Sequence, residues 1–237
     1  MFTYKGKSSK DMYLRVLNEV VFTSPTRDVN VIQIPGRDGD IIMNNGRYES
    51  VIRTVPCRLE TPEDINVEQV INDINNWLID EENDHELSWE NDPDFKYLAR
   101  IDNGVISQRF LSRFGHATIN FRLQPIKYLR DSLIEQAVPT GTNLVNPFNI
   151  DANPVIRIIG SGDITIIFDE KPLVLTDINE GCVIDSEKHM ITSLDGRVML
   201  FKSMRSPFPV LKPRNNQITF SRSDIQVFIT PRWGTLV

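Results

Sequence analysis

Residues 61–101 read TPEDINVEQVINDINNWLIDEENDHELSWENDPDFKYLARI, and the hydrophobic period changes within this stretch. Apolar side chains first recur at steps of three and four residues, which places them on one face of a helix over residues 61–80. These side chains are Val67, Val70, Ile71, Ile74, Trp77 and Leu78. Thr61 suits the N-cap and Pro62 suits the first helical position. The stretch predicts one amphipathic helix that packs on a sheet.

After this helix the apolar residues alternate with polar ones. Leu87 and Trp89 precede the turn sequence Asn91-Asp92-Pro93-Asp94, and the alternation resumes at Phe95. This pattern is typical of a β-hairpin. Residues 29–34, 51–55 and 117–123 are further strand candidates.

The second half of the chain shows no helical period. Residues 137–153 are rich in Pro, Gly and Asn and are interpreted as a linker. Beyond them, short apolar segments are separated by turn sequences about every 8–12 residues, which is typical of a β-sandwich. The sequence therefore predicts a mainly β protein with one main helix, divided into domains at 1–136 and 137–237.

The composition is that of a globular protein: 40% of the 237 residues are hydrophobic and the net charge is −6. Cys57 and Cys182 are too few for a disulfide framework and too far apart for a metal finger. No apolar stretch approaches the ~20 residues of a membrane span, and residues 1–14 lack the apolar core of a signal peptide. We expect no membrane partner, folding in the cytosol, and reduced thiols.

Charge is distributed unevenly along the chain. From Glu60 to Phe95 every charged side chain is acidic, whereas the remainder of residues 1–136 has a basic surplus and the second half is balanced. One interpretation is a solvated acidic helix face. The other is a pair of complementary patches that meet on neighbouring copies, with Glu81, Glu82 and Asp84 in the contact; such head-to-tail contacts can close into a ring.

Motifs of catalysis or metal binding are missing from the sequence. Its three histidines are scattered, and neither an HExxH motif nor a GxSxG motif occurs. The segment Gly160-Ser161-Gly162-Asp163 lies between two predicted strands and is interpreted as a hairpin turn. Both thiols lie in apolar strand patterns, where an inert buried Cys is the usual case. We expect no catalytic residue, no cofactor and no metal site.

Two short motifs have both an interface and a structural interpretation. Pro35-Gly36-Arg37-Asp38-Gly39 is a shaped loop, and Arg37 can donate two hydrogen bonds to a partner's carboxylate or remain in a tight turn. Arg232 and Trp233 follow Pro231 near the end of the chain. They are either an interface anchor, because Trp and Arg are frequent at hot spots, or a strand end in the core.

Several segments resemble the distal tail proteins of long-tailed bacteriophages. In the first half these are residues 2–9 with Asp11, residues 34–39 (IPGRDG), the acidic helix with its Trp, and residues 87–97. In the second half they are Asn153-Pro154, residues 158–165 (IIGSGDIT), residues 208–211 and residues 231–233. The segments follow one another in the order of that family from end to end.

The resemblance implies a structural role in a virion tail tip that is assembled in the host cytoplasm. Members of this family form a hexameric ring: an N-terminal β-sandwich with a helix and a hairpin builds it, and a galectin-like β-sandwich faces outward. The implied partners are other copies of the chain, the tail tube protein, the tail-tip protein and receptor-binding proteins. DNA would pass through the channel without sequence-specific binding, which agrees with the net negative charge.

Two other function classes stay open. A carbohydrate-binding module would bind glycan without assembling, and it would need an exposed aromatic side chain to stack on the sugar. A cell-wall hydrolase of the tail tip would need a catalytic motif, which the sequence does not show.

Overall fold

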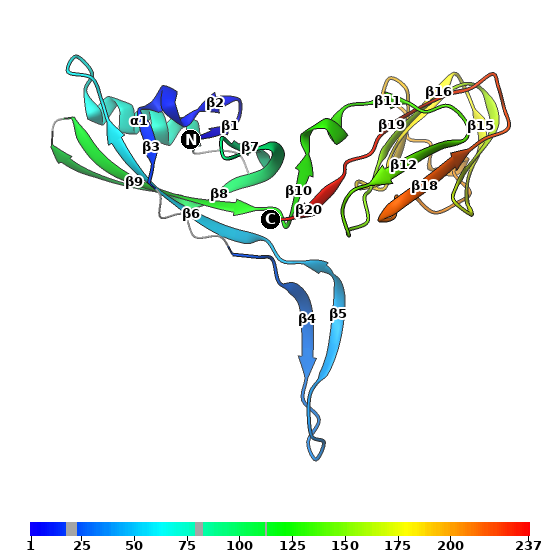
Figure 1. Ribbon diagram of the computed structural model, residues 1–237, viewed down its shortest axis with the longest axis horizontal. Helices are drawn as coiled ribbons and strands as arrows, with labels where there is room; N and C mark the ends of the chain where they lie inside the picture. The colour runs from blue at the N-terminus through cyan, green and yellow to red at the C-terminus, as the bar shows by residue number, and fades with distance from the viewer. Residues whose placement is uncertain (18–22, 79–82, 112) are drawn as a thin grey trace. The chain divides into compact units, whose positions relative to one another are not determined.

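The computed structural model describes residues 1–17, 23–78, 83–111 and 113–237, and these form mostly strands with one α-helix (Figure 1). The chain divides into a first unit, Met1–Lys127 with Leu236–Val237, and a second unit, Tyr128–Thr235. The predicted fold class, mainly β with one main helix, is confirmed. The units divide at 127/128, whereas the sequence places its boundary at 136/137.

The first unit contains a sheet in the order β2-β1-β7-β8-β9-β6-β3. Short strands β10 (Ile126–Leu129) and β20 (Gly234–Leu236) pair with each other where the chain passes between the units. The other strands of the sheet are β1 (Phe2–Tyr4), β2 (Lys7–Ser8), β3 (Leu14–Val16), β6 (Val51–Glu60), β7 (His85–Trp89), β8 (Asp92–Leu111) and β9 (Phe114–Leu123). A short 3-10 helix, η1 (Ser9–Met12), follows β2.

The helix α1 (Val67–Leu78) begins later than the predicted residue 61. Thr61 does not cap it, because the Thr61 N–H donates to the Arg113 carbonyl and the Arg113 side chain donates to the Thr61 carbonyl. Instead, the Asn66 side chain accepts the Glu68 N–H at 2.9 Å, as an N-cap does. The predicted residues 79 and 80 lie outside the described part of the chain.

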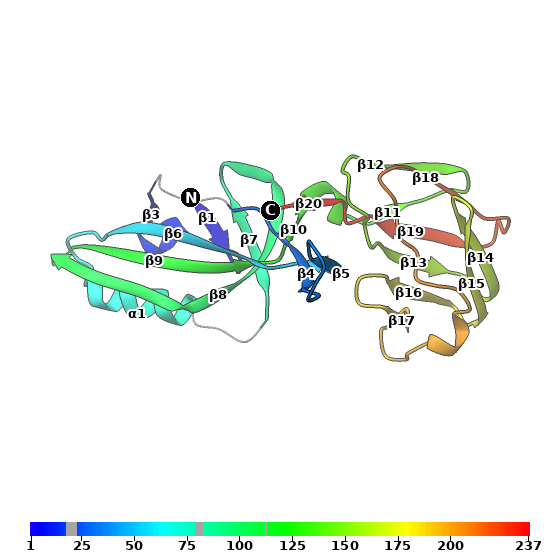
Figure 2. The same cartoon turned by 90° about the horizontal axis from the view of Figure 1, so that it is seen from below.

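The core of the first unit lies between α1 and the sheet, and α1 runs along one face of it (Figure 2). Val67, Val70, Ile74 and Leu78 are buried, as the helical period predicts. Aromatic rings fill the centre: Phe2 stacks on Trp77 at 5.9 Å and meets Phe121 edge-on at 5.4 Å. The predicted hairpin of β7 and β8 is present, with Leu87 opposite Tyr97.

A second hairpin, formed by β4 (Arg27–Ile32) and β5 (Ile41–Tyr48), is a separate two-stranded sheet of the first unit. Among the described strands, β4 and β5 pair only with each other. Figure 1 shows this ribbon extending away from the other strands of the unit. We call it the β4–β5 ribbon.

The second unit is a β-sandwich. Its sheets have the orders β11-β19-β13-β16-β17 and β12-β18-β14-β15, and apolar side chains from both form one core. The strands are β11 (Gln136–Ala137), β12 (Thr142–Asn146), β13 (Val155–Ile159), β14 (Gly162–Phe168), β15 (Lys171–Ile178), β16 (Gly181–Asp185), β17 (Met190–Ser193), β18 (Arg214–Thr219) and β19 (Gln226–Thr230). Two 3-10 helices, η2 (Arg130–Leu133) and η3 (Phe201–Ser203), complete the unit. Its predicted likeness to galectins stays a prediction.

The predicted linker at 137–153 is wrong, because β12 lies within it and pairs with β18 over five residues. The Asn side chains that indicated a linker bind main-chain groups instead. Asn146 accepts the Phe148 N–H and donates to the Ile150 carbonyl, and Asn143 accepts the Asn216 N–H. Asn143 and Asn146 are therefore structural residues of the sandwich and do not mark a linker.

Candidate assembly surface

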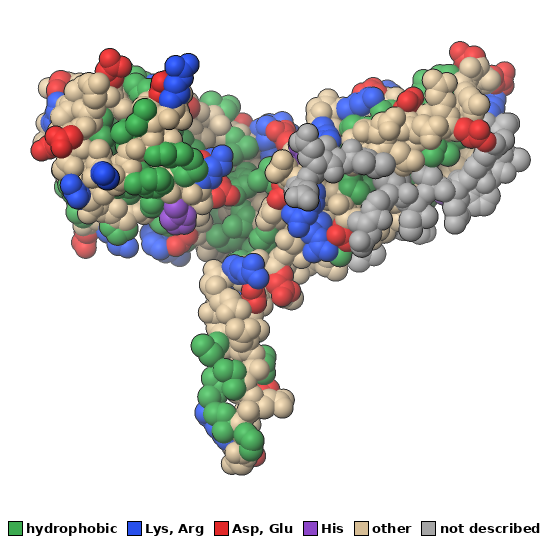
Figure 3. Space-filling model, turned by 180° about the vertical axis from the view of Figure 1, so that it is seen from behind, with side chains coloured by type: hydrophobic (Ala, Val, Ile, Leu, Met, Phe, Trp, Pro, Cys, Tyr) green, Lys and Arg blue, Asp and Glu red, His purple; other side chains and the backbone are tan. Residues whose placement is uncertain are grey.

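The β4–β5 ribbon leaves large apolar side chains in water. Figure 3 shows hydrophobic side chains along it on the face in view. The exposed ones are Val29 (38%), Val31 (54%), Ile32 (43%), Ile34 (42%), Ile42 (67%) and Met43 (53%). A gathering of apolar side chains on so small an element marks an interaction site, whereas single exposed hydrophobic residues are ordinary.

The ribbon itself is well specified. β-branched residues pair across it, with Val31 opposite Ile42 and Ile32 opposite Ile41. Near its base, Asp28 accepts hydrogen bonds from the side chains of Asn45 (2.8 Å) and Arg47 (2.5 Å). These hydrogen bonds lower the pKa of Asp28. Within the described residues, the hairpin is thus held by its own register and by the polar groups near its base.

Both faces of the outer half of the ribbon are apolar. Side chains alternate between the faces along a strand, so the pair Val31–Ile42 lies on one face and the pair Ile32–Ile41 on the other. Strands that read as continuous apolar runs are those buried on both sides. The ribbon is therefore built to be covered on two faces, which the folded monomer does not provide.

The predicted loop Pro35–Gly39 forms the tip of this ribbon. Gly36 and Gly39 both have φ of +81°, a left-handed conformation that favours glycine. The Arg37 N–H donates to the Ile34 carbonyl at 3.1 Å, which closes the turn. Within the described part of the chain, no ion pair engages the Arg37 or Asp38 side chain. The turn interpretation holds for the backbone, and the charged side chains stay available to a partner.

The acidic segment is neutralised largely within its own unit. Asp84 accepts from Arg100 at 3.2 Å and from Gln124. Glu63 pairs with Arg113 at 2.6 Å, and Glu86 pairs with Lys96 at 2.8 Å. The charge asymmetry of the sequence therefore does not by itself require a neighbour. Glu81 and Glu82 lie outside the described residues, and their predicted contact stays a prediction.

One part of the acidic segment joins a partly buried cluster beneath β8. Asp92 accepts from Tyr97 and from Lys127, the latter at 2.6 Å. Burial alone would raise the pKa of Asp92, but the hydrogen bonds from Lys127 and Tyr97 hold it below its ordinary value. Arg53 lies over the rings of Trp89 and Tyr97. Lys127 and Arg53 are therefore basic partners of Asp92 at the start of β8.

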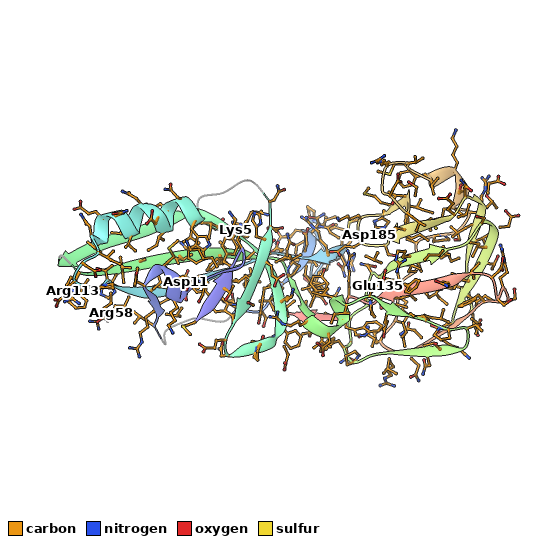
Figure 4. All side chains as sticks on the ribbon, turned by 90° about the horizontal axis from the view of Figure 1, so that it is seen from above. Lys5, Asp11, Arg58, Arg113, Glu135 and Asp185 are labelled. Carbon is orange, nitrogen blue, oxygen red and sulfur yellow. The ribbon has the colours of Figure 1, made fainter. Side chains whose placement is uncertain are left out.

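The structure places Arg232 and Trp233 inside the second unit rather than on an outward anchor. Trp233 is 8% exposed and belongs to the core. Arg232 donates to Asp185, labelled in Figure 4, at 2.7 and 3.1 Å, and its guanidinium lies 3.1 Å from Glu187. Of the two sequence interpretations, the strand end in the core is the one observed.

The described residues hold no group of three or more His, Cys, Asp or Glu side chains placed to bind a metal ion. In the same residues, no helix combines the length and the apolar character needed to cross a membrane. Cys57 and Cys182 are both buried and free, and burial raises the pKa of each thiol to about 12. Neither thiol is poised as a nucleophile.

The sequence predicts the loop at the tip of the ribbon, but it does not predict that the apolar side chains on both faces of the ribbon are exposed. A strand prediction at 29–34 does not say what covers the side chains Val31 and Ile32, or the run Ile41-Ile42-Met43. The signal was present: apolar residues fall on both faces of two strands, and the first unit already has a core without them.

Comparisons with known proteins agree with this architecture. A family model described as the phage tail protein RIFT-related domain matches residues 4–123. The crystal structure of SPP1 Dit (gp 19.1), described as a paradigm of the hub adsorption apparatus in Gram-positive infecting phages, has a TM-score of 0.74 at 19% identity. That match covers 96% of this chain and 97% of the other, and it shows a shared fold.

A chain of the phage p2 baseplate in its activated conformation with Sr matches with a TM-score of 0.44 and 11% identity, over 92% of this chain and 90% of that one. No curated protein matches the chain in sequence. The family model spans half of the 237 residues. The predicted resemblance to phage distal tail proteins is confirmed, and the chain belongs to the siphophage tail family defined by the phage tail protein RIFT-related domain.

Proposed function

We propose that six copies of this structural tail protein close into a ring that joins the tail tube protein to the tail-tip protein and leaves a channel for DNA. The observation that carries the proposal is the β4–β5 ribbon, whose outer half is apolar on both faces and uncovered in the monomer. The fold shared with SPP1 Dit, described as a hub protein, supports the same role.

A ring of identical copies suits a ribbon of this kind. The ribbon and the surface that covers it are different parts of the chain, so the contact is head-to-tail, and such contacts close when their rotation allows. Every copy then both offers a ribbon and covers one, which leaves no apolar ribbon in water.

The magnitudes favour a closed ring over an open pair. Complete burial of an aliphatic side chain contributes about 1.5–3 kcal/mol, so six partly exposed side chains contribute on the order of 5–10 kcal/mol. Association costs about 4–15 kcal/mol in lost freedom. For a single contact, the free energy gained by burial is therefore close to the free energy lost on association. Ring closure adds a final contact between subunits that are already held, which makes the complete ring more stable than its fragments.

Receptor-binding proteins are proposed as outer partners of the assembled ring, in a virion tail tip built in the host cytoplasm. A carbohydrate-binding module would need an exposed aromatic side chain, and Trp233, the only Trp of the second half, lies in the core. The hydrolase alternative gains nothing from the matched proteins, which are structural tail proteins.

The test is native mass spectrometry of the purified chain together with negative-stain electron microscopy. We expect a species of six times the 27.2 kDa subunit mass and closed rings with six-fold symmetry. A chain that stays monomeric at all concentrations, or that stops at a dimer, would contradict the proposal.

A further inference from the structure

A groove in the first unit lies between η1 and α1 and has a volume of about 580 Å³. Its floor is apolar and is formed by Met12, Tyr13, Val70 and Trp77. The indole of Trp77 is fixed, since its Nε1 donates to the Tyr4 carbonyl at 3.2 Å and its ring stacks on Phe2. The groove is thus a hollow with a fixed aromatic side chain in its lining, and its volume lies within the roughly 300–1,000 Å³ range of ligand sites in proteins.

The rim of the groove carries charges of both signs. Asp11, labelled in Figure 4, is already engaged, because its carboxylate accepts the N–H of Ser8, the N-cap of η1, at 3.2 Å and completes the capping box. Lys7 on β2 and Asp73 on α1 are exposed rim residues. Among the residues that the structure describes, neither Lys7 nor Asp73 has an ion-pair partner. Within the described part of the chain, the charges of Lys7 and Asp73 are therefore unpaired beside the apolar floor.

The end of the β4–β5 ribbon presents the complementary set. Val31 and Ile42 are cross-strand partners on one face of the ribbon, and both are exposed apolar side chains. Arg37, Asp38 and Asp40 are exposed, and within the described residues they form no ion pair. A strand of six to eight residues at about 3.3 Å per residue carries this tip roughly 20 Å beyond its base. The tip is therefore placed to reach a surface on another molecule.

We propose that the ribbon tip of one copy docks in the η1–α1 groove of a second copy, with Val31 and Ile42 on the apolar floor, Arg37 toward Asp73, and Asp38 or Asp40 toward Lys7. The inference rests on the proposed ring and names the surface that one face of each ribbon covers. Opposite charges at the rim fix the orientation of the tip, while the apolar floor supplies the burial.

Cysteine cross-linking between differently marked copies tests this contact. Arg37→Cys and Asp73→Cys are made in separate chains, and the two chains are mixed before mild oxidation. The native thiols of Cys57 and Cys182 are 1% and 0% exposed and leave a low background. We expect a disulfide-linked dimer in the mixture and none in either variant alone. Glu170→Cys, at an exposed position of the second unit, replaces Asp73→Cys as the matched control and should give no dimer.

A charge exchange gives an independent readout. Arg37→Glu alone and Asp73→Arg alone should each raise the concentration for half-assembly about tenfold, because like charges then meet at every contact of the ring. The combination should return it to within about threefold of the wild type. Unfolding temperatures of all variants are measured to show that the monomers stay folded.

The outcomes separate this contact from the proposed ring. Six-fold rings without a cross-link in the mixture, and without rescue by the exchanged pair, would overturn the docking and leave the ring standing. A faster-migrating monomer from a chain carrying both cysteines, with no dimer in the mixture, would place the tip in its own groove and also overturn it. Absence of any assembly in the wild type would contradict the ring and the docking together.

Discussion

Arg232 lies in the left-handed region with φ of 56°, beside the buried Trp233. In the sequence, Arg232 has two interpretations: an interface anchor, or part of a strand end in the core. The structure shows the second. The guanidinium of Arg232 binds both oxygens of Asp185, in a site where both side chains are less than one-fifth exposed. Burial alone would lower the pKa of Arg232, but the hydrogen bonds and charge of Asp185 raise it. The residue orients the strand end against the sandwich.

Truncation of this guanidinium should destabilise the second unit. Arg232→Ala leaves the carboxylate of Asp185 partly buried without its cation, and we expect a loss of about 2–3 kcal/mol of unfolding free energy. The matched control is Lys212→Ala, which breaks the exposed pair of Lys212 with Asp151 and should cost less than about 0.5 kcal/mol. Urea unfolding of both variants checks this, and equal losses would contradict it.

The same ion pair predicts a pH dependence. Burial alone would raise the pKa of Asp185, yet the hydrogen bonds from Arg232 hold the pKa below its ordinary value. The unfolded chain therefore takes up this proton first, and the contribution of Asp185 is complete above about pH 3.9 and is lost as the pH falls through the folded pKa.

Asp185→Asn should remove this component while keeping the oxygen that accepts the N–H groups of Glu187 and Lys188. Unfolding temperatures measured from about pH 5 down to pH 2 should fall less steeply in the variant than in the wild type. Parallel curves would show that Asp185 does not titrate in the way argued.

The two native thiols should be unreactive in the folded protein. Desolvation raises the pKa of Cys57 and of Cys182 to about 12, so the nucleophilic thiolate is scarce at neutral pH. A thiol reagent such as DTNB at about pH 7.5 should label neither residue natively and both in denaturant. Rapid labelling of the native chain would contradict the burial of these strands.

At the scale of elements, the β4–β5 ribbon differs from the others, because its sequence is apolar while its surroundings are solvent. α1 and β6 bury one face each, as their periods predict. The ribbon instead exposes apolar side chains on both faces. A sequence pattern of this kind encodes burial that the monomer alone cannot supply.

Substitution in the ribbon should therefore leave the stability of the monomer unchanged. Ile42→Asp combined with Met43→Asp replaces side chains that are 67% and 53% exposed, so we expect the unfolding free energy to change by less than about 0.5 kcal/mol. Val55→Asp, at a fully buried position of β6, is the opposite control and should cost more than about 4 kcal/mol. Differential scanning calorimetry at concentrations below assembly, where all the proteins are monomers, distinguishes the two; a large loss in the ribbon variant would place these side chains in the monomer core.

Individual elements also mark the limit of sequence-based prediction. Period and turn chemistry sufficed for the apolar face of α1 but not for its start, for the β7–β8 hairpin, and for several strands of the sandwich but not for β12, because these features depend on local patterns to different degrees. The linker prediction failed because the Asn side chains of residues 143 and 146 bind main-chain groups. Asn143 binds the N–H of Asn216, which is far away in the sequence, and Asn146 binds the carbonyl of Ile150 in the turn that follows. The position of Trp233 could not be decided either, since its environment comes from strands far away in the sequence.

At the scale of the whole molecule, the charge pattern suggested a head-to-tail assembly but assigned it to the acidic segment. Pairs such as Arg113–Glu63 and Lys96–Glu86 show that much of this charge is satisfied within one unit. Apolar exposure on the ribbon, which depends on what the rest of the chain leaves uncovered, is the stronger indication of assembly.

In the proposed assembly, the β4–β5 ribbon is the element that closes the ring. The most direct measurement is the native mass of the wild type and of the Ile42→Asp/Met43→Asp variant at equal concentration, with Val145→Asp as a control at a strand residue that is 57% exposed. We predict six-subunit rings for the wild type and the control, and a folded monomer for the ribbon variant. Six-subunit rings from the ribbon variant would contradict the account.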